Sequence, residues 1–182
     1  MIAVLISIRP RWCEKIISGE KTIEVRKTRP KMDTPFKCYI YCTKPEEKLL
    51  TIMKDGDENY GETYHGKPVF IKTEKAPTTG LWDKRKKVIG EFLCDQIINI
   101  NGAGRIPSDA ARPTCLEPAE LHRYLGAATG YGWHISDLRV YDHPRDLWEF
   151  TGLRQTKYGL APGPITRPPQ SWRYVEEELW KD

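Results

Sequence analysis

The sequence lacks a hydrophobic run long enough to cross a membrane. A membrane helix needs about 18 or more consecutive apolar residues, and no stretch of the 182 residues approaches that length. The apolar start, residues 1–6, is short and has neither a basic leader nor a small-residue cleavage site, so it predicts a strand rather than a signal peptide. We therefore expect a cytoplasmic protein without a membrane partner.

The sequence also has few cysteines and no C-x-x-C pair. Five cysteines are an odd number, which is typical of reduced thiols in a chain of this length without a secretion signal. Cys38 and Cys42, with His134 or His143, could imitate a zinc site. Small buried side chains are the better interpretation, because zinc ligands are more tightly spaced and carried on a loop. We expect no metal and no cofactor.

Several catalytic patterns and a single-sign charge are missing as well. The chain has no Ser-His-Asp order, no phosphate loop and no glycine-rich dinucleotide fingerprint. The net charge of +4 is modest, but residues 1–44 hold ten Lys or Arg and four Asp or Glu, a net +6, whereas residues 88–150 sum to −4. A basic N-terminal third suits a polyanionic partner, although many soluble proteins carry such a surface without function.

The hydrophobic pattern predicts mostly short strands with two short helices. A helix at residues 10–18 begins with Pro10 and ends before Gly19, and a second helix is expected at residues 117–125. Residues 44–86 are charged and contain many glycines and prolines, which predicts a mobile insertion with one short strand at residues 68–73. The strands are expected at residues 2–8, 22–27, 36–43, 88–100 (with a bulge or bend at Gly90), 133–141, 147–150 and from 172 onward.

This order of elements favours an α+β, mainly β class. We expect one domain spanning residues 1–182, built as a partly closed antiparallel β-barrel with short flanking helices.

The most informative segment begins with S-I-R-P at residues 7–10 and ends with G-E-K-T-I-E-V-R at residues 19–26. A strand, a proline-initiated helix and the pattern G-x-K-x-x-E-x-R follow one another in that order. This arrangement resembles the ASCH domain of the PUA-like superfamily, closely over residues 4–43 and more loosely over residues 88–95. The resemblance implies a small barrel that binds RNA or a modified nucleobase in a cleft lined by the motif positions.

Physical chemistry gives the motif residues a role. Glu24 and Arg26 are two apart on a strand, so they share a face and together offer a ligand an acceptor and a planar fork of donors. Lys21 stands where the strand begins, and its ammonium could reach over the mouth of a cleft. The alternative is a surface ladder of ion pairs, worth only about 0–1 kcal/mol. The resemblance favours the ligand site.

Other residues are candidates for binding the same ligand. Arg9 belongs to the motif, and Tyr41 lies on a strand face that is only partly apolar. Trp172 could stack on a base, an interaction of roughly 1–3 kcal/mol, and Gln170 could read a base edge. The prolines before Gln170 could equally do no more than direct the chain into its last strand.

A hydrolase of the same fold is the alternative function. Some small ASCH proteins look like amidohydrolases of acetylated cytidine, with a motif lysine, a threonine three residues later and a distant glutamate. Lys21 matches the lysine, Glu24 stands in place of the threonine, and Glu91 is a candidate for the glutamate. A ribonuclease would need an acid–base pair, which Lys21 with Glu24 or His134 could supply. The expected partner is RNA or a nucleoside-type ligand, with no obligate protein partner.

Overall fold

The computed structural model describes residues 1–43, 48–51, 70–73, 86–100 and 111–178. The chain divides into two compact units, Met1–Lys44 with Lys84–Asp182, and Pro45–Asp83. In the second unit, strands β4 (Lys48–Thr51) and β5 (Phe70–Thr73) pair antiparallel, which agrees with the strand expected at residues 68–73. The second unit nearly coincides with the predicted insertion. Most of residues 44–86 lies outside the described residues, and its mobility stays a prediction.

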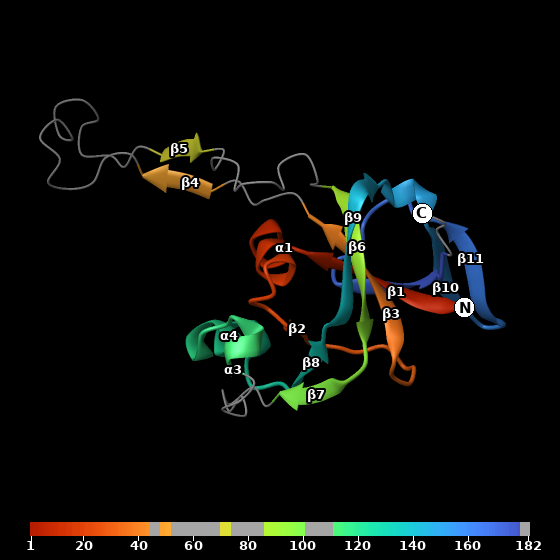
Figure 1. The fold of residues 1–182 in the computed structure, drawn as a ribbon, viewed down its shortest axis with the longest axis horizontal. Helices are drawn as coiled ribbons and strands as arrows, with labels where there is room; N and C mark the ends of the chain where they lie inside the picture. The colour runs from red at the N-terminus through yellow and green to blue at the C-terminus, as the bar shows by residue number, and fades with distance from the viewer. Residues whose placement is uncertain (44–47, 52–69, 74–85, 101–110, 179–182) are drawn as a thin grey trace, which may run out of the picture. The chain divides into compact units, whose positions relative to one another are not determined.

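The first unit is built on a seven-stranded sheet in the order β11-β10-β12-β1-β3-β6-β9 (Figure 1). The strands are β1 (Ile2–Ile8), β3 (Phe36–Cys42), β6 (Lys87–Cys94), β9 (Ser136–Arg145), β10 (Thr151–Thr156), β11 (Gly159–Pro164) and β12 (Trp172–Glu176). The neighbours pair antiparallel except β1 and β3, which are parallel. The mainly β class is confirmed. The barrel is not, because β9 and β11 each have one neighbour among the described strands.

Both faces of this sheet are covered, which explains why β1 is a continuous apolar run and not an alternating one. One face carries an apolar cluster around Leu5, Tyr39 and Tyr41. The register shifts beside Gly90 on both sides of β6, and a Cβ there would collide with the carbonyl oxygen of Arg139. The predicted bulge at Gly90 is therefore confirmed.

A three-stranded sheet packs on the other face, in the order β2 (Ile23–Arg26), β8 (Gly130–His134) and β7 (Ile97–Ile100). Its outer face forms a second apolar cluster with helix α4 (Pro118–Leu125). Its inner face turns toward the large sheet, since the Trp133 ring of β8 lies edge-on to Phe36 of β3 at 5.7 Å. Helices α1 (Pro10–Ile17) and α3 (Ala111–Thr114) and a 3-10 turn, η1 (Leu147–Glu149), complete the unit.

Four expectations for the elements are corrected. The long strand expected at residues 88–100 is two strands, broken at Asp95, because its halves belong to different sheets. The strand expected at residues 133–141 falls on two strands, β8 and β9, broken at Ile135 for the same reason. The strand expected at 147–150 is the 3-10 turn. Residues 151–164, which showed little periodicity, form the β10–β11 hairpin. No helix in the described part of the chain is long and apolar enough to span a membrane.

Candidate functional site

The motif strand β2 starts from a tight exit of helix α1. Gly19 has a φ of +77°, which ends the helix, and the Lys21 N–H then donates to the Lys15 carbonyl at 2.8 Å. This turn directs Lys21 into the protein rather than over its surface. Lys21, Glu24 and Arg26 are only 2%, 5% and 7% exposed. We call these three residues the motif trio.

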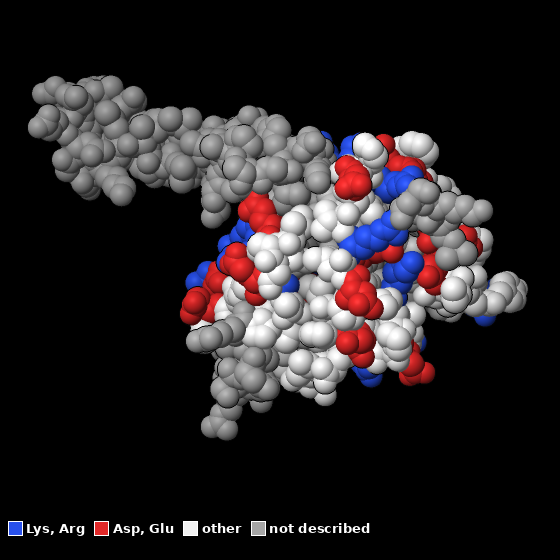
Figure 2. Space-filling view, in the orientation of Figure 1, with Lys and Arg blue, Asp and Glu red and all other residues white. Residues whose placement is uncertain are grey.

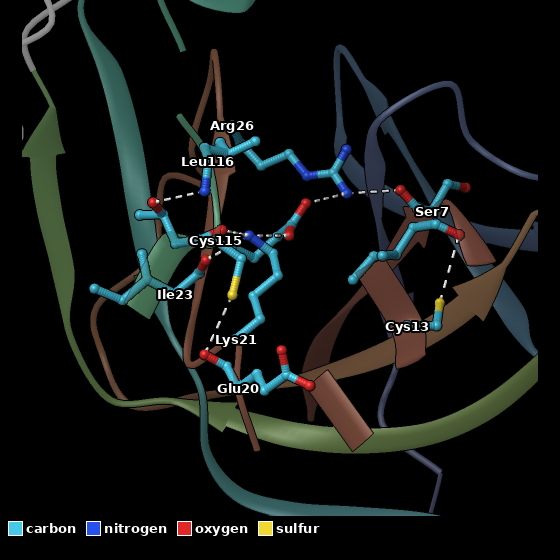
Figure 3. Close-up of polar contacts among 11 residues, drawn as sticks. Ser7, Cys13, Glu20, Lys21, Ile23, Arg26, Cys115 and Leu116 are labelled. Carbon is cyan, nitrogen blue, oxygen red and sulfur yellow. Dashed lines mark hydrogen bonds and ion pairs between the residues drawn. The ribbon is translucent and has the colours of Figure 1, made fainter. Parts of the chain in front are cut away.

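The sequence suggested that Lys21 carries a free ammonium at the mouth of a cleft. In the structure this ammonium is buried and fully bonded. Its Nζ donates to the carbonyl oxygens of Ile23 at 2.8 Å and Thr114 at 2.6 Å, and it lies 3.3 Å from Glu24 Oε2 (Figure 3). An ammonium has three donors, so these three acceptors use all of them. The ring of Trp12 covers the same group, with Nζ 5.1 Å from its centroid.

Glu24 joins Lys21 to Arg26. Its Oε1 lies 3.0 Å from Arg26 Nη2, and the same nitrogen donates to the Ser7 carbonyl at 2.6 Å (Figure 3). The shared strand face predicted for Glu24 and Arg26 thus brings them into direct contact. The trio links β2 to the end of β1 and, through Thr114, to the end of α3. Its role in binding stays a prediction.

Two buried N–H groups, Nε of Arg26 in the trio and Nε1 of Trp133 beside it, lack a hydrogen-bond partner among the described residues. Glu24 pairs with Trp133 in the register of β2 and β8, so Arg26 and Trp133 are diagonal neighbours on one face, within reach of long side chains. The Trp172 ring lies 6.0 Å from that of Trp133. Trp172 is half-buried, and its own Nε1 donates to Thr28 Oγ1 at 3.0 Å.

Solved structures of one protein from Zymomonas mobilis share this architecture. Its ASCH structure aligns with a TM-score of 0.57 at 18% identity, covering 96% of this chain and 88% of that chain. A serine-to-alanine mutant of it gives 0.59 at 18%, covering 96% and 89%. The chain has an ASCH-type fold. No protein-family model matches the sequence, and no match was found among curated proteins.

Two predicted site residues, Tyr41 and Glu91, lie on the opposite side of the large sheet from the motif trio. Tyr41 packs in the apolar cluster with Leu5 and Tyr39, and burial raises the pKa of its hydroxyl. Glu91 pairs with Tyr39 in the β3–β6 register and accepts a hydrogen bond from the Tyr141 hydroxyl at 2.5 Å. Successive side chains of a strand point to opposite faces of the sheet. Tyr39 and Tyr41 of β3 therefore point away from the face that carries Phe36, which is the face covered by the three-stranded sheet and the trio. Tyr41, a candidate for binding the same ligand, and Glu91, the candidate for the hydrolase glutamate, therefore do not lie beside the motif trio.

Arg9 and Gln170 lie nearer to the motif trio. Arg9 is exposed and precedes helix α1, where its carbonyl accepts from the Trp12 and Cys13 N–H groups. Gln170 is exposed in the turn before β12. The residues flanking it hold Ser7: Pro169 accepts from Ser7 Oγ at 2.6 Å, and the Ser171 carbonyl accepts from its N–H at 2.9 Å. The carbonyl of the same serine binds Arg26.

His134 lies on the opposite face of β8 from Trp133, because the two are consecutive in the strand. Its Nδ1 lies 2.7 Å from Asp95 Oδ1 on a partly exposed surface. This hydrogen bond holds the pKa of Asp95 below its usual range. The three-stranded sheet thus stands between His134 and the motif trio, and the ribonuclease pair of Lys21 with His134 is not assembled.

All five cysteines are free thiols, and four of them are buried. Burial raises the pKa of Cys13 and Cys38, and that of Cys94 to about 12. Within the described ranges no group of three or more His, Cys, Asp or Glu side chains is placed to hold a metal ion.

A surface hollow of about 440 Å³ lies away from the motif. It is lined by Met1, Ile2, Leu153, Leu160, Glu176 and Glu177, and none of the predicted site residues borders it. Two carboxylates at its rim make it a poor site for a polyanion.

Sequence reasoning did not single out the Trp133 N–H or the Thr114 carbonyl. Trp133 was visible as one of several tryptophans, for which core packing is the usual explanation. No signal in the sequence placed residue 114 beside residue 21, because that contact depends on how α3 follows the three-stranded sheet.

Proposed function

We propose that this ASCH-fold protein binds RNA or a modified nucleobase at a site formed by Arg26, Trp133 and Trp172. The observation that carries the proposal is the pair of buried N–H donors, Arg26 Nε and Trp133 Nε1, that have no partner among the described residues. A buried donor left unsatisfied costs about 1–3 kcal/mol. A ligand that supplies acceptors would remove that cost.

A nucleobase has the matching chemistry. Its carbonyl and ring nitrogens are acceptors, and its face stacks on an aromatic side chain. Trp172 offers such a ring beside Trp133, with a centroid separation of 6.0 Å. In this proposal Arg26 touches the ligand, while Glu24 and Lys21 hold Arg26 in place.

The contacts favour binding over hydrolysis by Lys21 and Glu24. The Lys21 ammonium is surrounded by three acceptors, and each oxygen of Glu24 faces a cation. A proton acceptor needs a free lone pair within reach of the substrate. Glu91 and His134 lie on other faces of the two sheets. Incubating the protein with mixed RNA and acetylated cytidine, and analysing for products, tests the hydrolase alternative directly.

The binding test is calorimetric titration with a panel of nucleosides, including acetylated cytidine, and with short RNA. Trp172→Leu should weaken binding about 5- to 160-fold, the equivalent of one stacked base. Trp148→Leu is the matched control, because Trp148 is 76% exposed elsewhere on the surface, and it should leave affinity unchanged. Absence of binding by the wild-type protein, or equal affinity for Trp172→Leu, would refute the proposal.

A second variant tests the donors themselves. Trp133→Phe keeps an aromatic ring against Phe36 and removes the N–H together with the rest of the five-membered ring of the indole. We expect affinity to fall roughly 2- to 13-fold, the value of one net hydrogen bond, with thermal unfolding recorded in parallel. Unchanged affinity in a folded Trp133→Phe protein would show that this N–H does not contact the ligand.

A further inference from the structure

The motif strand is followed directly by the segment K-T-R-P-K at positions 27–31, and four of its five residues contact aromatic side chains from three different elements. Lys27 Nζ lies 5.3 Å from the ring centroid of Tyr124 in α4, and the Arg29 guanidinium carbon lies 5.9 Å from that of Tyr131 in β8. Thr28 accepts from Trp172. Tyr174 beside Trp172 accepts from the Lys31 N–H at 2.7 Å. We call this segment the basic–aromatic loop.

The charges of this loop face solvent. Lys27, Arg29 and Lys31 are all exposed, while Pro30 between them is buried and anchors the segment. A cation above an aromatic ring at an exposed site gains only about 0.5–1 kcal/mol, so the ammonium and guanidinium groups keep donors available for other anions. Tyr124 is 38% exposed.

The combination is more specific than charge alone. On the face drawn in Figure 2, the basic and acidic side chains of the described residues are interspersed, as on many proteins. In the basic–aromatic loop, by contrast, the charged groups of Lys27 and Arg29 each lie over a tyrosine ring. The backbone N–H of Lys31 donates to Tyr174, and the loop is joined to Trp172 through Thr28.

We infer that the basic–aromatic loop binds single-stranded RNA, as a continuation of the Arg26–Trp172 site. The inference rests on the proposed function and names its ligand as a strand rather than a free nucleoside. Cations along a groove with aromatic rings between them are the arrangement that follows a phosphate backbone and stacks its bases. Rings can stack only on unpaired bases, so a duplex would not use Tyr124 and Tyr131.

The test compares two double variants for binding to a single-stranded oligouridine of about ten nucleotides. Lys27→Ala with Arg29→Ala removes two cations of the loop. Arg154→Ala with Lys157→Ala removes the same two residue types from the β10–β11 hairpin, where Lys157 also lies over a tyrosine. Each phosphate contact on a single strand contributes about −0.7 to the slope of log affinity against log salt. We expect the slope to become shallower by about 1.4 for the first variant and to stay unchanged for the second.

A second pair tests the rings. Tyr124→Leu should weaken oligouridine binding about 5- to 160-fold, whereas Tyr158→Leu, at an 88% exposed tyrosine with its own lysine, should not. Thermal unfolding of each variant shows that it is folded.

Titration with single nucleosides separates this inference from the proposed function. If the wild-type protein binds neither nucleosides nor oligouridine, the proposed function fails and the inference falls with it. If nucleosides bind but oligouridine binds no better, or if the loop variant keeps the wild-type salt slope, the inference alone fails. It is also overturned if duplex RNA or polyglutamate binds as tightly as oligouridine, because the surface would then hold any polyanion or an acidic peptide.

Discussion

Two adjacent stretches of this chain, residues 21–26 and residues 27–31, both carry lysine and arginine but place them in opposite environments. In the first, the motif trio is buried between two sheets, and each cation lies beside Glu24. In the second, the three cations are exposed, and those of Lys27 and Arg29 lie beside aromatic rings. The comparison teaches that a carboxylate decides whether lysine and arginine side chains can be buried. Where a carboxylate lies between the cations, the whole cluster can be buried. Where no carboxylate is present, the cations remain in solvent.

The energetic consequence differs as well. A buried ion pair adds little net stability, because desolvation offsets the attraction, yet removing one member leaves an uncompensated charge in the interior. An exposed cation beside a ring contributes little and costs little to remove. Substitutions in the motif trio should therefore alter folding, and those in the basic–aromatic loop should alter binding.

Glu24→Gln should give the largest effect. The amide leaves the cations of Lys21 and Arg26 buried without a counter-charge, so we expect a loss of about 3–5 kcal/mol in the free energy of unfolding, measured with urea. Glu20→Gln is the control: Glu20 pairs with Lys15 at 3.0 Å on the surface, and its loss should leave the urea midpoint unchanged. Equal midpoints for wild type and Glu24→Gln would show that the trio is not the buried network the structure describes.

Arg26→Lys against Arg29→Lys tests the same contrast at constant charge. A lysine side chain at position 26 ends one bond short of Nη2, the nitrogen that contacts both Glu24 Oε1 at 3.0 Å and the Ser7 carbonyl at 2.6 Å, so it should lose one of the two contacts. Loss of one hydrogen bond to a charged group should cost about 1.5–3 kcal/mol. Arg29→Lys keeps a cation near Tyr131 and should change the unfolding free energy by much less. If both variants unfold at the same urea concentration, the buried environment of Arg26 and the exposed environment of Arg29 do not differ in their contribution to the free energy of unfolding.

The sequence was sufficient for several local elements. The Pro10 start and the Gly19 end depend on backbone conformations that few residues adopt, and at Gly90 the neighbouring strand leaves no room for a Cβ, so the signals of all three are local. The β10–β11 hairpin was missed because it lies at the edge of the large sheet, where several side chains remain exposed and no clear alternation develops.

The candidate site was predictable only in part. Strand geometry was enough to put Glu24 and Arg26 on one face. It could not show which side of the large sheet Tyr41 and Glu91 would occupy, since that depends on the pairing of β1, β3 and β6. Nor could it show that Lys21 would be buried, because two of its three acceptors are backbone carbonyls, one of them 93 residues away.

The partly exposed pair of Asp95 and His134 lies between the two extremes and should give the smallest effect. The His134 hydrogen bond lowers the pKa of Asp95, so the pair stabilises the fold above the ordinary aspartate pKa of about 3.9 and loses that contribution as pH falls through the lowered value. Asp95 is 46% exposed, so screening limits the contribution to a few tenths of a kcal/mol. Asp95→Asn should therefore be slightly less stable than wild type at pH 6, and the difference should shrink at pH 3. A difference in urea midpoint that is the same at both pH values would mean that the carboxylate charge of Asp95 adds no stability.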